Sequence, residues 1–204
     1  MTRRECLDQA HRARSRGKIQ RAIGLYEQAL SSHPEDYETR ARLAPLLVKA
    51  RRTGDAWGNF AGAIAGYAGA GFHNKALSVA IQSMEQLPHR PESWTRVAQL
   101  YLEEGRREDA IDVLVRGRLQ FRSKKSVAQA LSVLHCLVKI ESSFPVRFDI
   151  ASTTALAGRK PEALIMLNRL QRTAESRDER RLVHAALWRV RRNPVDLFRS
   201  IFGA

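Results

Sequence analysis

The stretch WTRVAQLYLEEGRREDAIDVL, from Trp94 to Leu114, decides the fold of this chain. Apolar residues recur in it at helical spacing on both sides of Gly105, and Ala110 follows that glycine by five residues. Two short helices joined at the glycine would bury these residues against each other, as in a helix-turn-helix unit of about 34 residues. The stretch therefore predicts a pair of antiparallel helices.

The same marker, a glycine followed five residues later by an alanine, recurs along the chain. It is found at Gly17 and Ala22, at Gly71 and Ala76, and at Gly158 and Ala163. A glycine adopts the positive φ that ends a helix, and an alanine lets two helices cross closely. This repetition predicts a stacked solenoid, an architecture that points to binding rather than catalysis.

The intervals between the four glycines are unequal. Gly71 and Gly105 are 34 residues apart, whereas 54 residues separate Gly17 from Gly71 and 53 separate Gly105 from Gly158. Each long interval holds about 20 extra residues, the length of one more helix with its turn. We therefore expect additional helices near residues 37–51 and 125–140.

The residue types of the repeat resemble those of the tetratricopeptide repeat family. The resemblance is carried best by Trp94, Val97, Ala98, Tyr101, Gly105, Ala110 and Leu114, and it covers about 170 of the 204 residues. It implies an all-α antiparallel helix-turn-helix solenoid in a single domain over residues 1–204. The expected units lie near 3–36, 57–90, 91–124 and 144–177, with the two extra helices between them and a C-terminal capping helix within 177–204.

The end of the chain carries the signals of that capping helix. Asn193 suits a helix N-cap and Pro194 the first helical position. An apolar stripe follows at Leu197, Phe198, Ile201 and Phe202. A terminal helix would lay this stripe over the open end of a solenoid. The alternative is a docking helix for a partner or for a second copy of the chain.

The resemblance also implies a ligand groove, lined by four positions of the first helix of each unit. These positions are Arg4, Leu7, His11 and Arg14, then Gly58, Ala61, Ala65 and Ala68, then Glu92, Thr95, Gln99 and Leu102, then Pro145, Phe148, Ser152 and Ala155. The branch of the family that clamps acidic chaperone tails has Lys and Asn where this chain has Leu7 and His11, so that clamp is not expected. Extra helices could also turn half of these positions outward.

Charge is the second informative feature. The net charge is +14, and Arg supplies 28 of the 35 basic residues. Residues 1–52 carry about +6, residues 53–89 about −1 and residues 90–204 about +9. Such a field attracts acidic proteins, nucleic acid or anionic lipid without choosing among them. The alternative is that the arginines reflect composition and lie on solvated outer faces, with Arg116, Arg118 and Arg122 complementing a helix end.

No pattern of catalytic, cofactor or metal chemistry occurs in the sequence, so none of these sites is expected. The six histidines are scattered, Cys6 and Cys136 lie in different units, and GAGF at 69–72 lacks the order of a phosphate loop. Gly58, Gly62 and Gly66 repeat as in membrane helix dimers, but the Ala- and Gly-rich segment favours close packing over a membrane span. The start, MTRRECLDQAHRAR, has no apolar core typical of a signal peptide.

These observations predict a cytoplasmic adaptor or scaffold, not an enzyme. Its ligand would be a peptide or helix of a partner protein in the groove, acidic near Arg4 and Arg14. The alternatives are a nucleic-acid-binding protein that uses the basic N- and C-terminal thirds and, more weakly, a peripheral membrane adaptor. Self-association is left open by the sequence.

Overall fold

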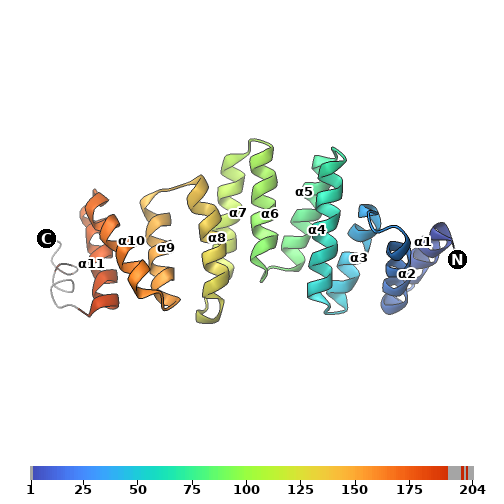
Figure 1. The fold of residues 1–204 in the computed structure, drawn as a ribbon, viewed down its shortest axis with the longest axis horizontal. Helices are drawn as coiled ribbons and strands as arrows, with labels where there is room; N and C mark the ends of the chain where they lie inside the picture. The colour runs from blue at the N-terminus through green and yellow to red at the C-terminus, as the bar shows by residue number, and fades with distance from the viewer. Residues whose placement is uncertain (1, 193–198, 200, 202–204) are drawn as a thin grey trace. The chain divides into compact units, whose positions relative to one another are not determined.

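The chain is entirely helical in the part that the structure describes, residues 2–192 together with Arg199 and Ile201. This structure is a computed structural model, and it shows eleven α-helices, one short 3-10 turn and no strand within those residues (Figure 1). The predicted all-α helical repeat fold is confirmed. The chain divides into two compact units, Met1–Arg106 and Arg107–Ala204. The single-domain organisation stays a prediction.

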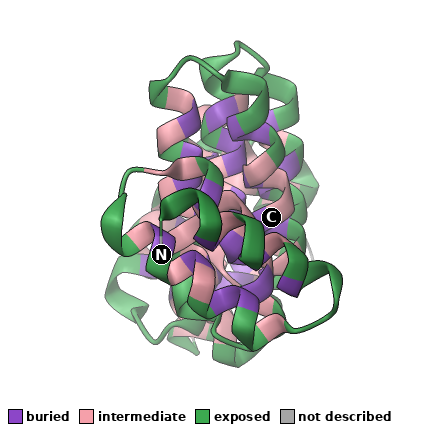
Figure 2. Ribbon diagram, turned by 90° about the vertical axis from the view of Figure 1, so that its right-hand side faces the viewer, coloured by how far each residue is buried: buried purple, intermediate pink, exposed green. Residues whose placement is uncertain are grey.

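The first unit contains six helices that pack on one another in chain order. Their bounds are α1 Arg3–Ser15, α2 Ile19–Ser32, α3 Tyr37–Lys49, α4 Thr53–Gly69, α5 His73–Gln86 and α6 Pro91–Glu103. In Figure 2 the buried residues of this unit lie where helices face each other, and the turns are exposed. One core cluster joins α1 to α4, with Ala10, Tyr26, Leu47 and Phe60 fully enclosed.

The second unit contains the remaining helices, and consecutive members again pack together. Their bounds are α7 Arg107–Gln120, the 3-10 turn Lys124–Ser126, α8 Val127–Ile140, α9 Phe144–Leu156, α10 Lys160–Thr173 and α11 Arg177–Arg191. Helix α11 also contacts α9. It begins at a capping box, in which the Ser176 hydroxyl accepts from the Glu179 amide and the Glu179 carboxylate accepts from the Ser176 amide. Of the predicted terminal stripe only Ile201 lies within the described residues.

Five helices end in the same left-handed turn. The residue at the turn has a φ between 60° and 81°, and it is Gly17, Arg51, Gly71, Gly105 or Gly158. In each turn its amide donates to the carbonyl three residues back, and the next amide donates to the carbonyl five before it, at 2.8 to 3.2 Å. This pair of bonds satisfies carbonyls that a helix end leaves open, and in each case the next helix begins two residues after the turn residue.

Arg51 explains the first irregular interval. It lies 34 residues after Gly17 and 20 before Gly71, so the 54-residue interval is one full repeat plus one helix. Helix α4 lies between the left-handed turns at Arg51 and Gly71, and α3 occupies the expected extra segment at 37–51. The sequence pattern missed this turn because an arginine holds the conformation that favours glycine. The 53-residue interval contains α8, as expected near 125–140.

A fully buried alanine follows each of these turns by five residues. The five are Ala22, Ala56, Ala76, Ala110 and Ala163, and every one has no exposed surface. An alanine allows neighbouring helices to pack closely, because a longer side chain would push them apart. Ala56 belongs to the Arg51 turn, so the alanine marks this repeat even where the glycine is missing.

The glycine stripe of α4 serves helix packing at two of its three positions. A Cβ built on Gly66 would lie 2.6 Å from Cγ of Tyr37 in α3, and one on Gly62 would lie 3.0 Å from Cδ of Arg40. A Cβ on Gly58 would meet nothing within 4 Å. Tyr37 also packs edge-on against Tyr67, with ring centroids 4.8 Å apart. Gly62 and Gly66 therefore let α3 approach α4 closely.

An ion pair inside the second unit corrects the expectation for Arg118. Its guanidinium donates two hydrogen bonds of 2.9 Å to the two carboxylate oxygens of Asp149 in α9, and a third, of 3.3 Å, to the Thr153 hydroxyl. The Arg118 side chain is only 19% exposed. A bidentate, half-buried pair of this kind fixes orientation as well as adding energy. Arg118 therefore joins α7 to α9 and is not simply a cation at a helix end.

We expect Gly66→Ala to destabilise the first unit by about 1–3 kcal/mol, because the new methyl group must displace Tyr37. The matched control is Gly58→Ala in the same helix, which should be neutral or stabilising by up to about 1 kcal/mol, since alanine favours helix and meets open space. Urea unfolding followed by circular dichroism measures both. Equal effects of the two substitutions would show that α3 does not approach α4 at residue 66.

Candidate functional site

Helices α1, α2 and α3 bring four polar side chains together in the first unit. We call His11, Arg14, Tyr26 and Arg42 the basic face. Nη1 of Arg42 lies 3.0 Å from Nε2 of His11, and the Tyr26 hydroxyl lies 3.4 Å from Nδ1 of the same ring. An arginine only donates, so Nε2 accepts and the proton of the neutral imidazole is on Nδ1. His11 is therefore held between a cation and a phenol.

The surroundings of His11 keep it neutral. Burial lowers the pKa of His11 below 6.5, and the charges of Arg42 and Arg14 lower it further, while Asp8 opposes them. Burial raises the pKa of Tyr26, although Arg14 and Arg42 act in the opposite direction. The basic face thus carries its positive charge on two guanidinium groups, with a titratable imidazole between them.

An ion pair anchors the start of α1 to the start of α3. The Arg3 guanidinium donates to the Asp36 carboxylate, which also accepts from the amide and hydroxyl of Thr39. Burial raises the pKa of Asp36, but the hydrogen bonds from Arg3 and Thr39 outweigh it and leave the pKa below its usual value. This contact sets α1 beside α3, so Arg42 can reach His11. Arg4, which follows Arg3 on α1, is exposed.

Two residues of the predicted first-unit groove, His11 and Arg14, lie near Arg42 of α3, and their role as ligand contacts stays a prediction. His11 and Arg14 lie together, whereas Arg42 was missed because its helix had no place in the expected units. The helix near 37–51 was expected, but the turn that ends it was not; its signal is the distance of 34 residues from Gly17 to Arg51, with Ala56 five residues later. Because residue 51 is an arginine, the turn lacks the glycine that marks the other four.

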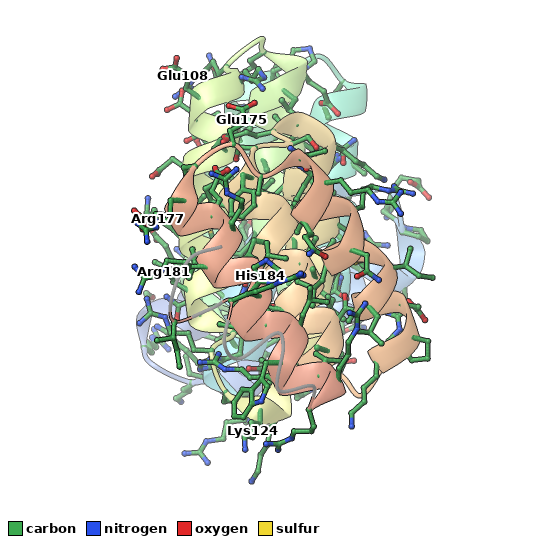
Figure 3. The ribbon with its side chains drawn as sticks, turned by 90° about the vertical axis from the view of Figure 1, so that its left-hand side faces the viewer. Glu108, Lys124, Glu175, Arg177, Arg181 and His184 are labelled. Carbon is green, nitrogen blue, oxygen red and sulfur yellow. The ribbon has the colours of Figure 1, made fainter. Side chains whose placement is uncertain are left out.

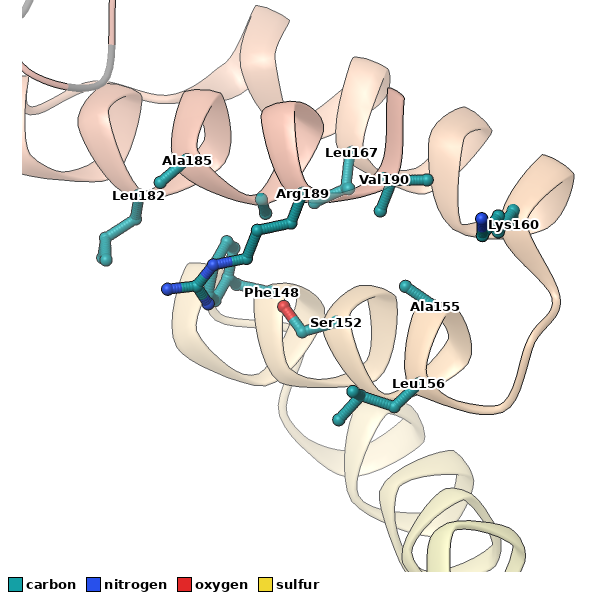
Figure 4. Close-up of a pocket in the computed structure, with 11 residues that line it drawn as sticks. Phe148, Ser152, Ala155, Leu156, Lys160, Leu167, Leu182, Ala185, Arg189 and Val190 are labelled. Carbon is teal, nitrogen blue, oxygen red and sulfur yellow. The ribbon is translucent and has the colours of Figure 1, made fainter. Parts of the chain in front are cut away.

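A pocket in the second unit collects the predicted groove residues of α9. Phe148, Ser152 and Ala155 line one side, and Leu182, Ala185 and Arg189 of α11 line the other. Its volume is about 390 Å³. Figure 4 shows Phe148 and Ser152 facing the α11 side chains across the opening, with Arg189 reaching over it. The apolar walls and the two basic side chains, Arg189 and Lys160, suit an apolar side chain next to an acidic group.

None of the predicted groove residues of α4 and α6 lines this pocket. On α4, Ala61 is half-buried and Ala65 is exposed. On α6, the amide of Gln99 accepts from Arg96 at 2.8 Å and donates to Glu103 at 3.0 Å, and the Thr95 hydroxyl donates to the Glu92 carbonyl at 3.3 Å. These contacts lie within one helix. Their role as ligand contacts stays a prediction.

The basic side chains of the second unit are spread over several helices. Figure 3 places Arg177 and Arg181 along one side of α11 and Lys124 well away from both. Arg116 pairs with Asp112 at 3.5 Å and Arg159 with Glu162 at 3.1 Å. Phosphate backbones are usually followed by a continuous basic groove with aromatic side chains for base stacking. The labelled cations do not form such a track.

Across residues 2–192, Arg199 and Ile201, no group of three or more His, Cys, Asp or Glu residues is arranged to hold a metal ion. Within the same residues, no helix combines the length and the apolar character needed to cross a membrane. The absence of catalytic and cofactor sites stays a prediction.

Comparison with known proteins finds likeness in structure only. No protein-family model matches the chain, and no curated protein matches its sequence. Similar solved structures include a tetratricopeptide repeat protein of Parabacteroides merdae, at 12% identity over 98% of this chain and 90% of that one, with a TM-score of 0.35. A thermophilic tetratricopeptide repeat protein of Thermus thermophilus is 20% identical over 91% and 99%, with a TM-score of 0.29. The tetratricopeptide repeat domain of P58(IPK) is 13% identical over 96% and 58%, with a TM-score of 0.39.

The internal geometry of the chain identifies the repeat. Left-handed turns stand 34 residues apart at Gly17 and Arg51 and again at Gly71 and Gly105, each followed after five residues by a buried alanine. This is the spacing of the family that the sequence around Trp94 resembles. The chain is an all-α helical repeat protein whose repeat spacing resembles that of the tetratricopeptide repeat family.

Proposed function

We propose that this chain is an adaptor or scaffold that binds an acidic segment of a partner protein on the basic face of α1 to α3. The observation that carries the proposal is the cluster of His11, Arg14 and Arg42, in which two guanidinium groups lie beside a neutral imidazole. Arg4 and Arg14 are exposed on α1. Such cations are available to an incoming carboxylate.

A protein ligand fits this face better than a nucleic acid does. The aromatic ring of the face, Tyr26, is fully buried and cannot stack on a base. The opening between α9 and α11 in the second unit is apolar, which suits a side chain of a peptide. The two surfaces belong to different units, and each would make its own contact with a partner.

Charge reversal tests the basic face. We expect Arg4→Glu combined with Arg14→Glu to weaken binding of a fluorescent deca-glutamate peptide at least tenfold, about 1.4 kcal/mol, because like charges would then meet. The matched control is Arg116→Glu with Arg122→Glu, two exposed arginines of the second unit, and it should bind almost as the wild type does. Arg118 is left intact because it holds α7 to α9.

Fluorescence anisotropy at about 150 mM salt measures the affinity, and a parallel titration uses a single-stranded RNA oligonucleotide. Stronger loss in the Arg116 and Arg122 variant, with tight RNA binding by the wild type, would favour the nucleic-acid alternative. Unchanged circular dichroism of both variants shows that the fold is intact.

The pKa of His11 gives a second prediction. In the free protein the folded-state pKa lies below 6.5, so the stability that neutral His11 provides is full above pH 6.5 and is lost as the pH falls toward the folded pKa. Bound carboxylates favour the imidazolium, so we expect the acidic peptide to raise the pKa of His11 and its affinity to increase on acidification from pH 7.5 to 5.5.

An NMR titration of the His11 ring with and without the peptide measures both effects. His11→Gln should keep binding at pH 7.5 and lose its increase at pH 5.5. A pKa of His11 that is the same in the free and bound protein would place the ligand elsewhere.

A further inference from the structure

A second groove lies on another side of α9, away from the pocket with Phe148 and Ser152. It is bounded by α8 and α10 and has a volume of about 480 Å³. Its walls are mostly aliphatic, with Val138 from α8, Ile150 from α9, and Ile165, Met166 and Leu170 from α10. Ile165 is 63% exposed, although the same helix buries Leu167 completely. The groove therefore leaves a large aliphatic side chain in water.

Arg147 lines this groove, and one of its hydrogen-bond donors has no acceptor among the described residues. Its Nε is buried and has no hydrogen-bond partner in the described part of the chain. A buried donor without an acceptor costs about 1–3 kcal/mol, more when the group is charged. Arg147 lies in the first turn of α9, and the residue is only half-buried, so other parts of its side chain line the open groove.

The groove also has an excess of positive charge. Arg147 and Arg169 make no ion pair within the described residues, whereas the lining acid Glu162 is already paired with Arg159 at 3.1 Å. A ligand that matches these features needs aliphatic side chains for the walls and a carboxylate for the cations. Nucleic acid supplies anions but no aliphatic side chains, so it does not fit the walls.

We propose that the groove between α8 and α10 binds a segment of a partner protein that presents aliphatic side chains next to a carboxylate. The aliphatic side chains pack on Ile150, Ile165 and Met166, and the carboxylate accepts from Arg147 with Arg169 nearby. This surface is separate from the basic face of α1 to α3 and does not depend on it. It gives the second unit a binding surface on a side of α9 that the predicted groove residues do not reach.

The test uses a fluorescein-labelled 15-residue helical peptide as the probe. The peptide carries leucines at positions i, i+3, i+4 and i+7 with glutamates beside them, and its counterpart has glutamine in place of glutamate. We expect the full chain to bind the glutamate peptide at least tenfold more tightly than the glutamine peptide. Equal binding of the two peptides, or no binding of either, overturns the proposal.

Two variants locate the contact. Ile165→Gln should weaken the glutamate peptide at least tenfold, and because this side chain is exposed the fold is not affected. Arg147→Met keeps the aliphatic stem and should abolish the preference for glutamate over glutamine. Its thermal melting temperature should be equal to or above that of the wild type, since the unpaired donor is removed. A lower melting temperature would show that Arg147 has a structural role and overturn the assignment.

Leu156→Gln is the matched control, because Leu156 is 65% exposed but lines the pocket between α9 and α11. Leu156→Gln should bind the glutamate peptide as the wild type does. The Arg4→Glu, Arg14→Glu variant should also bind it normally, which would show that the peptide does not bind at the basic face. Loss in Leu156→Gln would place the peptide in the other pocket.

Two further outcomes name a different occupant and overturn the proposal. One is tighter peptide binding after truncation beyond Arg192, which would show that the chain covers its own groove. The other is a dimer in sedimentation that Ile165→Gln dissociates, which would assign the groove to a second copy.

Discussion

A left-handed residue at the end of a helix is the constraint on which the rest of this structure depends. Its amide and the next one satisfy two carbonyls of the finished helix, and its positive φ directs the chain back along the helix that it has just left. The next helix then starts within two residues, and the alanine five residues after the turn is fully buried. Five turns of this kind, at Gly17, Arg51, Gly71, Gly105 and Gly158, set the spacing of both units.

The sequence predicted the fold well because the turn favours particular residue types, a glycine followed five residues later by an alanine. Glycine marked four of the five turns, and the alanine confirmed each of them. The fifth escaped because Arg51 carries the conformational cost that glycine avoids, and packing of Ala56 and Leu47 in the core overcomes that cost. The extra helices at 37–51 and 125–140 were still predictable, since helix length alone accounts for about 20 residues.

The binding surfaces were predictable only in part, because they depend on contacts between helices that are distant in sequence. His11 and Arg14 lie on one helix, and their spacing placed them on one face. Nη1 of Arg42 on α3 lies 3.0 Å from Nε2 of His11 on α1. The sequence of α3 alone does not predict this contact. In the same way, the sequence around Arg118 indicates only a cation near a helix end, because its partner Asp149 lies on α9. Side-chain partners across helices are set by packing, which no single segment encodes.

The measurement that tests the central claim most directly is a reciprocal exchange at two turns, followed by urea unfolding. Arg51→Gly should stabilise the chain by about 1–2 kcal/mol, since glycine adopts the left-handed conformation without the penalty of a Cβ. Gly105→Ala should destabilise it by a similar amount, because a Cβ there meets nothing within 4 Å and adds only backbone strain. Opposite changes in the free energy of unfolding for the two variants would support the same left-handed turn at both residues. A loss of stability in Arg51→Gly would contradict the account, because residue 51 would then not occupy the repeated left-handed turn.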